Sequence, residues 1–249
     1  LYTFDGWSPG GYTVRVVNAS VTSSRPGSVA GLLGVQTFRT TAPAGMALAD
    51  ANRVGGETPD LPDAGANIGG GSLAALTTAS ATPQSIAPIA LGTTDLGGVD
   101  FGFNFSTVVN ARESGQGSLG QFLVNASALL NTGLAQAGLT AGVEHSVFMV
   151  TDGLAHPGLR AGLANLLTAG VVRIAFTSGP APVTDAFTRV DGATQTTNVG
   201  DTNPGLFPAT PAVGVDAVAI TPLAKPEVEL VDASVSSVGL DLQAADCTV

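Results

Sequence analysis

The sequence predicts an all-β fold with occasional helices, and three observations support that prediction. The chain of 249 residues contains 33 glycines and 15 prolines but only 5% aromatic residues, a composition typical of many turns and short strands. Short runs alternate apolar and polar residues, which is the pattern of a half-buried strand. One segment in the middle has helical spacing instead.

Strands in the N-terminal part are predicted where apolar residues alternate with polar ones. Residues 11–17 (GYTVRVV) have this pattern, and residues 35–40 and 99–105 are candidates of the same kind. Between about 41 and 95 the chain is rich in Ala, Gly, Pro, Ser and Thr. We expect long loops and short strands there, lying over a sandwich, with a flexible linker as the alternative.

A capped helix is predicted over residues 118–130. Its apolar side chains recur three and four residues apart, which is helical spacing. Ser118 followed three residues later by Gln121 is the start of a capping box. The apolar positions are Leu119, Phe122, Leu123, Ala126, Leu129 and Leu130.

Strands recur after this helix, with tight turns and little helix between them. A second short helix is predicted at 158–170, with leucines on one side and Gly170 as its stop. Such spacing is what the coils of a β-solenoid, or a sandwich, would give. The strand candidates are 107–111, 145–150, 171–176, 182–192, 215–220, 226–232 and 238–243.

Charge is scarce in this chain. Asp, Glu, Lys and Arg make up 11% of the residues, against roughly 25% in an average soluble domain. Such a surface suits a protein covered by neighbouring copies, or a secreted protein in which neutral polar residues replace charges. The net charge of −10 with nine basic residues argues against a nucleic-acid partner, which needs a cationic face.

Cys247 is the only cysteine, so no disulfide framework and no thiolate metal site are predicted. No run of 18 apolar residues exists, and we expect no membrane span. The chain begins at Leu1 without a methionine or a signal-like segment, which indicates a processed protein or a piece of a longer one.

Candidate chemical groups are few. Asp152 with His156 could act as an acid–base pair, although a surface-loop histidine is the preferred interpretation, and His145 precedes a buried strand. Ser114 does not lie in a G-x-S-x-G elbow. No histidine spacing supports zinc.

Scattered carboxylates offer two further alternatives. Glu227 and Glu229 alternate onto one face of a strand, but a paired-carboxylate glycosidase needs a partner from a second strand, so a solvated face is preferred. We predict no catalytic, cofactor-binding or metal residues and no cofactor. Structural calcium is left open, with oxygen ligands from Asp60 with Asp63 or from Asp201 with Asn203.

Two blocks of sequence carry a family resemblance. The first is VVNARESGQGSLGQFLVNASAL, and the second is VVRIAFTSGPAPVTDAFTRVDGATQ. The motif positions are Ser114, Gly115, Gly117, Ser118 and Leu119, then Pro182, Val183, Thr184, Asp185, Val190, Asp191, Gly192 and Gln195. These blocks resemble the opening of right-handed parallel β-helix (pectate-lyase-like) domains of large bacterial surface and secreted proteins. That family often has Arg-Gln after the leucine, where this chain has Gly120-Gln121.

The upstream segments GGYTVRVV and GVDFGFNF are similar to the prealbumin-like β-sandwich repeats that precede such regions. The resemblance therefore implies two domains. Residues 1–106 would form a prealbumin-like β-sandwich with long loops, and residues 107–249 the helix-capped start of a β-helix. The expected fold class is all-β, a β-sandwich followed by a short, helix-capped parallel β-helix-like region.

In such a stack the predicted helix would act as a lid. The first coil of a solenoid exposes an apolar end and unpaired strand edges unless something covers it. The structural cap would consist of Ser118, Leu119, Gln121, Phe122 and Leu123, with Leu119, Phe122 and Leu123 buried. The side chains expected to point outward are Gln121, Asn125 and Ser127.

We expect an extracellular or cell-surface structural protein rather than an enzyme. It would be a subunit of a bacterial filament, sheath or surface layer, with itself as partner in a homopolymer and cell-surface polysaccharide as a second partner left open. Residues 1–10 or 235–249 would lie at subunit contacts. The alternatives are an adhesin or glycan-binding stalk module and a β-helix polysaccharide lyase or hydrolase fragment.

Overall fold

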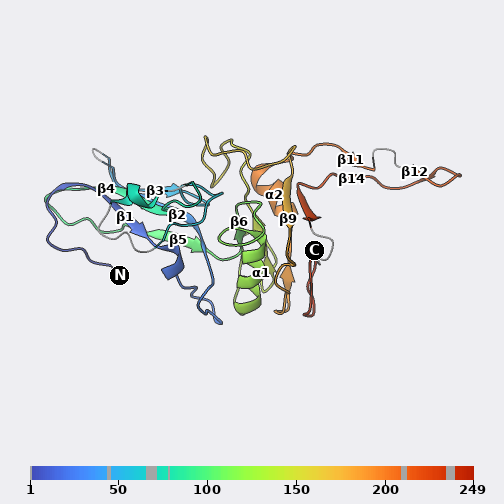
Figure 1. Cartoon of the computed structure of the whole chain (residues 1–249), viewed down its shortest axis with the longest axis horizontal. Coiled ribbons are helices and arrows are strands. Elements are labelled where there is room, and N and C mark those ends of the chain that lie inside the picture. Colours follow the sequence, from blue (N-terminus) through green and yellow to red (C-terminus); the bar gives the residue numbers. More distant parts are fainter. Residues whose placement is uncertain (1, 44–45, 66–71, 78, 209–211, 234–238) are drawn as a thin grey trace.

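The protein is mostly β with few helices. The computed structural model describes residues 2–43, 46–65, 72–77, 79–208, 212–233 and 239–249, and 10% of the residues are helical and 28% in strands. Figure 1 shows an elongated molecule in which the chain passes from an antiparallel part, through a central helix, to parallel strands and a projecting hairpin.

The first part contains two antiparallel sheets. Strand β1 (Gly10–Val16) pairs with β4 (Ser85–Leu91), and β2 (Val35–Thr41) lies between β3 (Ala49–Asn52) and β5 (Phe101–Asn104). The strands predicted at 11–17, 35–40 and 99–105 are therefore confirmed.

Residues 41–95 hold more regular structure than predicted. Besides β3 and the 3-10 turn Leu73–Leu76, this stretch supplies all seven residues of β4. Its sequence SIAPIAL contains a proline. Because proline cannot donate a hydrogen bond to a strand ladder, this residue argued against predicting a strand here. A further 3-10 turn of three residues, Asn18–Ser20, follows β1.

Outside the hairpin at residues 206–224, the ladders after β5 are parallel, whereas those before it are antiparallel. Isolated parallel bridges also join Val183 to Leu242 and Arg189 to Thr248. The parallel ladders are β6 (Thr107–Val108) with β8 (Val147–Phe148), β7 (Glu144–His145) with β10 (Thr188–Arg189), and β9 (Val172–Phe176) with β15 (Val228–Asp232).

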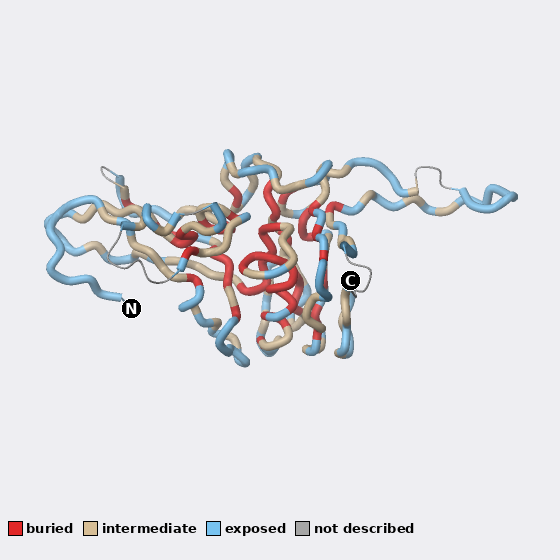
Figure 2. Tube along the Cα trace, viewed as in Figure 1, coloured by how far each residue is buried: buried red, intermediate tan, exposed pale blue. Residues whose placement is uncertain are grey.

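The central helix α1 (Leu119–Ala128) confirms the predicted helix. Its apolar side chains enter the largest buried cluster of the described residues, which collects residues from the parallel strands. Figure 2 shows buried backbone concentrated in this region. The cluster consists of Val108, Leu119, Phe122, Leu123, Ala126, Phe148, Val150, Val172, Ile174, Phe176, Val183 and Val190.

The second helix lies elsewhere than predicted. Residues 158–170 form turns and an isolated bridge between Thr168 and Val171, so the prediction there was wrong. Helix α2 instead spans Ala193–Val199, directly after the strand candidate 182–192, and it contains the motif position Gln195. Gly158 and Gly162 weaken a helix at 158–170. In α2 the Thr194 and Gln195 side chains accept hydrogen bonds from Phe148 N of β8 and from Val150 N, which hold this helix in place.

A hairpin, which we call the arm, projects from the parallel part (Figure 1). It comprises residues 206–208 and 212–224, and its two short antiparallel ladders leave six large apolar side chains 51% to 102% exposed. These are Leu206, Phe207, Val213, Val215, Val218 and Leu223. The ladders pair β11 (Leu206–Phe207) with β14 (Leu223–Ala224) and β12 (Ala212–Val213) with β13 (Val218–Ala219).

The remaining strand candidates have mixed outcomes. The candidate at 215–220 gives only β13, while β15 occupies most of 226–232. In 238–243, residue 238 lies outside the described residues, and Leu242 forms an isolated bridge. Within the described residues no helix is long and apolar enough to cross a membrane.

Candidate functional site

The candidate site is the junction where α1 lies between the antiparallel part and the parallel strands. Ser118 Oγ accepts a hydrogen bond from Gln121 N at 3.0 Å, which satisfies one free donor of the first helical turn. Leu119, Phe122 and Leu123 are at most 1% exposed and contact the parallel strands. A Cβ at Gly120 would lie 2.3 Å from Glu113 O, so only glycine allows the preceding loop to lie this close to the helix.

The other face of α1 is also buried, which corrects the expectation that it points outward. Gln121 and Asn125 are 8% and 2% exposed. Asn125 accepts from Leu33 N and donates to Leu33 O and Phe105 O. The Gln121 side chain donates to Asn125 and does not accept from Ser118 N, which donates to Gly115 O instead, so the capping box is formed only by its serine half.

Ser127, the third residue expected to point outward, is half-buried and donates to Pro182 O at 3.0 Å. The helix is therefore covered on one face by the antiparallel part and on the other by the parallel strands. It joins the two parts as well as covering the end of one of them.

The C-terminal end of α1 is closed by a loop from far earlier in the chain. Arg25 Nη2 donates to Leu129 O at 3.0 Å and to Leu130 O at 3.2 Å. A cation at this end also interacts favourably with the helix dipole. A Cβ at Gly27 would lie 2.1 Å from Ala128 O, so the loop requires glycine there.

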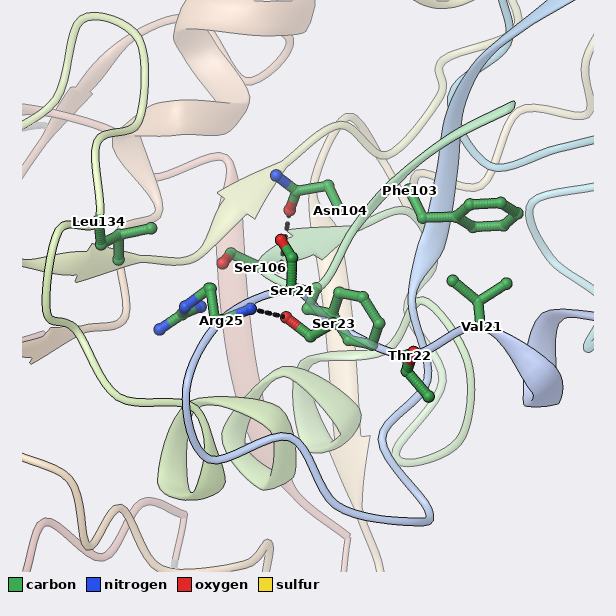
Figure 3. A pocket seen from close by; sticks show the side chains of 10 residues that line it. Val21, Thr22, Ser23, Ser24, Arg25, Phe103, Asn104, Ser106 and Leu134 are labelled. Carbon is green, nitrogen blue, oxygen red and sulfur yellow. Dashed lines mark hydrogen bonds between the residues drawn. The ribbon is translucent and has the colours of Figure 1, made fainter. Parts of the chain in front are cut away.

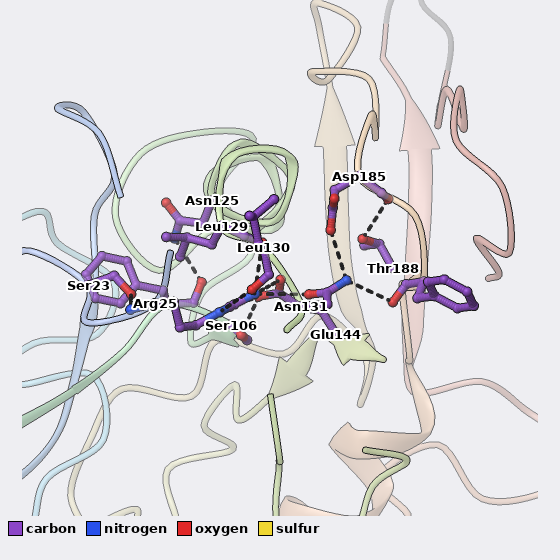
Figure 4. Close-up of polar contacts among 12 residues, drawn as sticks. Ser23, Arg25, Ser106, Asn125, Leu129, Leu130, Asn131, Glu144, Asp185 and Thr188 are labelled. Atoms are coloured by element: carbon purple, nitrogen blue, oxygen red, sulfur yellow. Dashed lines mark hydrogen bonds and ion pairs between the residues drawn. The ribbon is translucent and has the colours of Figure 1, made fainter. Parts of the chain in front are cut away.

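Arg25 also forms a two-pronged ion pair with Glu144. Both guanidinium nitrogens lie 2.7 Å from the two carboxylate oxygens, and the Glu144 side chain is fully buried. Ser106 donates a further hydrogen bond to Glu144 at 2.7 Å. Because Glu144 lies in β7, this pair fixes the antiparallel part against the parallel strands (Figure 4).

The same polar cluster extends to the strand β10 region. Asn131 donates to Asp185 Oδ2 at 2.9 Å and to Ala186 O at 2.8 Å, and its own oxygen accepts from Arg25 (Figure 4). Burial raises the pKa of Asp185, and the Glu144 carboxylate raises it further against the effect of Arg25. Asp185, one of the positions that carry the resemblance, contacts Asn131 just after the C-terminal end of α1.

A shallow pocket of about 310 Å³ lies beside this cluster. Figure 3 shows its wall formed by the 21–25 segment, by Phe103 and Asn104 of β5, and by Leu134. Arg25 and Ser106 line it, but both are engaged with the Glu144 carboxylate. The pocket therefore offers no convergent reactive groups among the described residues.

At three further places a glutamine side chain forms hydrogen bonds with backbone N–H and C=O groups, in the way that a neighbouring strand would. Gln136 accepts from His145 N and donates to His145 O, both at 2.8 Å. Gln195 accepts from Val150 N and donates to Val150 O, and Gln84 bonds Thr58 N and Leu61 O. A carboxamide carries one acceptor and one donor group, as a peptide unit does, so each side chain satisfies a buried backbone without adding charge.

The histidines hold single carboxylate partners. His145 is buried, with Nδ1 2.8 Å from Asp191 Oδ2, and His156 Nε2 lies 2.9 Å from Asp152 Oδ1. Burial of Asp152 raises the pKa of its carboxyl, but the Leu154 N–H and His156 outweigh this and the net shift is downward. Ser114 is exposed, and no hydrogen bond among the described residues links it to either histidine.

The two strand carboxylates differ, which corrects the predicted solvated face. Glu227 is 8% exposed and accepts from Thr196 Oγ1 of α2 at 2.6 Å, whereas Glu229 pairs on the surface with Arg173 at 3.5 Å. Glu227 thus fixes α2 to the strand region.

Two of the four calcium candidates, Asp63 and Asn203, have other partners. Asp63 receives hydrogen bonds from Arg15, Asn18 N and Gln84 N. Asn203 donates to Pro226 O. No group of three or more His, Cys, Asp or Glu side chains suited to a metal occurs among the described residues.

Sequence reasoning missed Arg25 and Glu144 because neither lies in a periodic segment or a motif. Their one signal is rarity: in a chain with 11% charged residues, a charged side chain next to a buried strand needs a partner. Comparison with protein-family models, curated proteins and solved structures gave no match to this chain.

Proposed function

We propose that this protein is an extracellular structural protein, a subunit of a cell-surface filament, sheath or surface layer that assembles through β-rich contacts. The arm is the observation that supports this most. Two-stranded hairpins are marginal in water, and this one exposes six large apolar side chains. Exposed apolar surface of this kind marks an interaction site.

The parallel ladders support the start of a right-handed β-helix in residues 107–249. Three ladders and two isolated bridges all run parallel, and α1 covers the buried cluster on one side. The antiparallel sheets of residues 1–106 support the prealbumin-like sandwich as the finer description of that part.

Residues 2–9 at the far end of the molecule offer a second apolar surface. Tyr2, Phe4 and Trp7 are 83%, 66% and 57% exposed, and Trp7 contacts Tyr12 edge to face. We propose that the arm of one copy packs on this aromatic segment of the next. Because the two surfaces differ, the same contact can repeat from copy to copy. It then produces a fibre, unless the rotation between successive copies closes the assembly into a ring.

Deleting residues 206–224 tests the proposal without disturbing the fold. Lys225 N donates to Gly205 O at 3.2 Å, so a short Gly-Ser turn can rejoin the chain at that point. Light scattering and negative-stain microscopy should show polymer for the intact chain and monomer for the deletion. Replacing the cross-strand pair Phe207 and Leu223 by serine should have the same effect with less change.

The control is serine at Val29, an apolar residue 59% exposed outside both surfaces, which should leave the polymer unchanged. An intact chain that stays a monodisperse monomer at high concentration excludes the structural proposal. If that monomer binds glycans, the adhesin alternative is favoured.

A further inference from the structure

Three arginines gather around a single carboxylate, that of Glu57. Arg39 lies in β2, Arg53 follows β3, and Arg160 comes from the loop after β8. We call these three with Glu57 the arginine cluster. It contains three of the nine basic residues of a chain whose net charge is −10.

The contacts within the arginine cluster leave Glu57 saturated. Glu57 Oε1 accepts from Arg39 Nη1 at 2.6 Å and from Arg53 Nε at 3.0 Å, and Oε2 accepts from Arg53 Nη2. Arg160 does not reach the carboxylate. It donates to the backbone oxygens of Gly56, at 3.0 Å, and Glu57.

The cluster therefore carries two uncompensated positive charges. Burial lowers the pKa of Arg39, and the Arg53 cation lowers it further. Burial also lowers the pKa of Arg160, with contributions from Arg53 and Arg39. Glu57 is the only carboxylate that opposes these effects in either case.

No other part of the chain supplies the missing negative charge. All 19 Asp and Glu residues belong to the described residues, because the undescribed positions carry no acidic side chain. The Arg39 and Arg53 side chains are only 9% and 19% exposed, and Arg39 Nε is buried without a partner. Partly buried cations without counter-charge are unfavourable.

An open pocket of about 300 Å³ adjoins the cluster at Glu57. Its wall combines the hydroxyl residues Thr77 and Thr82 with the apolar Leu73 and Ile86. Arg39 Nη1 also donates to Ile86 O, so the guanidinium reaches this wall. A few polar groups in a mainly apolar wall are typical of ligand pockets.

We infer that the arginine cluster binds an oxyanion group, a carboxylate, sulfate or phosphate, that enters from this pocket. The planar guanidinium presents paired N–H groups that match two oxygens of such a group. Among the described residues, Arg39 Nη2 and Arg53 Nη1 donate no hydrogen bond and are available to it. The anion supplies the charge that the chain lacks at this point.

Isothermal titration calorimetry with inorganic phosphate and with sulfate tests this inference, with chloride at equal ionic strength as reference. Saturable binding of phosphate or sulfate to the wild-type chain is expected. Side-chain Nε–H spectra should show Arg39 and Arg53 signals shifting with the same saturation. Binding no stronger than that of chloride overturns the inference.

Two variants with opposite expected effects separate a binding site from a purely structural ion-pair network. Arg53→Gln should weaken phosphate binding about 10- to 100-fold, because it removes charged hydrogen bonds. Glu57→Gln should strengthen binding, and phosphate should restore its thermal stability. A Glu57→Gln protein that is destabilised and gains nothing from phosphate shows a network only and overturns the inference.

Arg173→Gln is the matched control, because Arg173 pairs with Glu229 on an open surface with both side chains 51% exposed. It should bind phosphate as the wild type does, and a loss equal to that of Arg53→Gln would contradict the inference. Polygalacturonate, an acidic polysaccharide, identifies the source of the group. If polygalacturonate competes with phosphate, the natural ligand is a carboxylate carried by a polymer. If phosphate binds and polygalacturonate does not compete, the ligand is a free anion.

Discussion

The α1 junction and the arm both contain short strands, but those strands are buried at the junction and exposed in the arm. At the junction, short strands are stabilised by a buried helix, the Arg25–Glu144 pair and carboxamide contacts. In the arm, strands of two residues have only each other, and their large side chains face water. The contacts of the junction lie within one chain, whereas the apolar side chains of the arm are exposed, and we propose that a second copy covers them.

This difference suggests separate roles for the two regions, with the junction contributing to stability and the arm to assembly. Two groups of the chain's charged residues join segments that are distant in sequence, Arg25 with Glu144 and the arginine cluster. The arm contains one charged residue, Asp216, within residues 206–224. Variants at the junction should therefore change the free energy of unfolding, and variants in the arm should change assembly.

Glu144→Gln should have the largest effect on stability. It leaves the Arg25 cation without its counter-charge at a buried site, which costs about 3 to 5 kcal/mol. Urea titration measures the loss. Glu229→Gln, in the exposed pair with Arg173, should cost about 0 to 1 kcal/mol, and equal losses in the two variants would contradict the role given to the junction.

Phe122→Ala should come next, at about 3 to 5 kcal/mol, because it opens a cavity in the largest buried cluster. Val124→Ala, on the same helix but 40% exposed, is the control and should have little effect. A change below about 1 kcal/mol at Phe122 would mean that α1 does not cover the parallel strands in solution.

Gln195→Leu should cost about 2 to 4 kcal/mol, because Val150 N–H and C=O both lose their partner. Hydrogen exchange gives a local measurement: the Val150 amide should exchange faster while amides of the antiparallel sheets keep their rates. Gln243→Leu, at an exposed residue, should leave Val150 protected. An unchanged Val150 amide in Gln195→Leu would refute the peptide-like role of this side chain.

Glu113 should produce the smallest effect on stability, and this effect should disappear in acid. Hydrogen bonds from the Thr177 hydroxyl and from the Ser178 hydroxyl and N–H lower the pKa of Glu113 to about 2. A carboxyl with a lowered folded pKa contributes stability above its unfolded pKa, roughly 4.3, and loses it as the pH falls toward 2. Urea titrations of wild type and Glu113→Gln should differ at pH 7 and converge near pH 2; a constant difference would contradict this.

The sequence predicted elements whose signal is local. The alternation in β1, β2 and β5 and the Ser118 cap with the apolar face of α1 depend on neighbouring residues, and all are present. Helix α2 and the buried face of α1 could not be predicted in this way. Gln121 and Asn125 look like surface residues, and only the approach of residues 31–33, about ninety positions earlier, buries them.

The residues of the candidate site were even harder to predict from the sequence, because their partners lie far away along the chain. Arg25 and Glu144 are separated by 119 residues, and nothing local marks either of them as a partner. The arginine cluster likewise joins positions 39, 53, 57 and 160. Long-range pairs of this kind follow from topology, which composition and periodicity do not determine.

The buried carboxamide of Asn125 also links deamidation of this residue to opening of the α1 junction. Hydrolysis of the Asn125 amide would replace its donor by a carboxylate, which only accepts, opposite the carbonyl oxygens of Leu33 and Phe105. Asn125 is 2% exposed, so water reaches it only when the junction opens locally. A chain damaged during such an opening cannot close again with the same bonds, and the rate of deamidation at Asn125 therefore reports how often the junction opens.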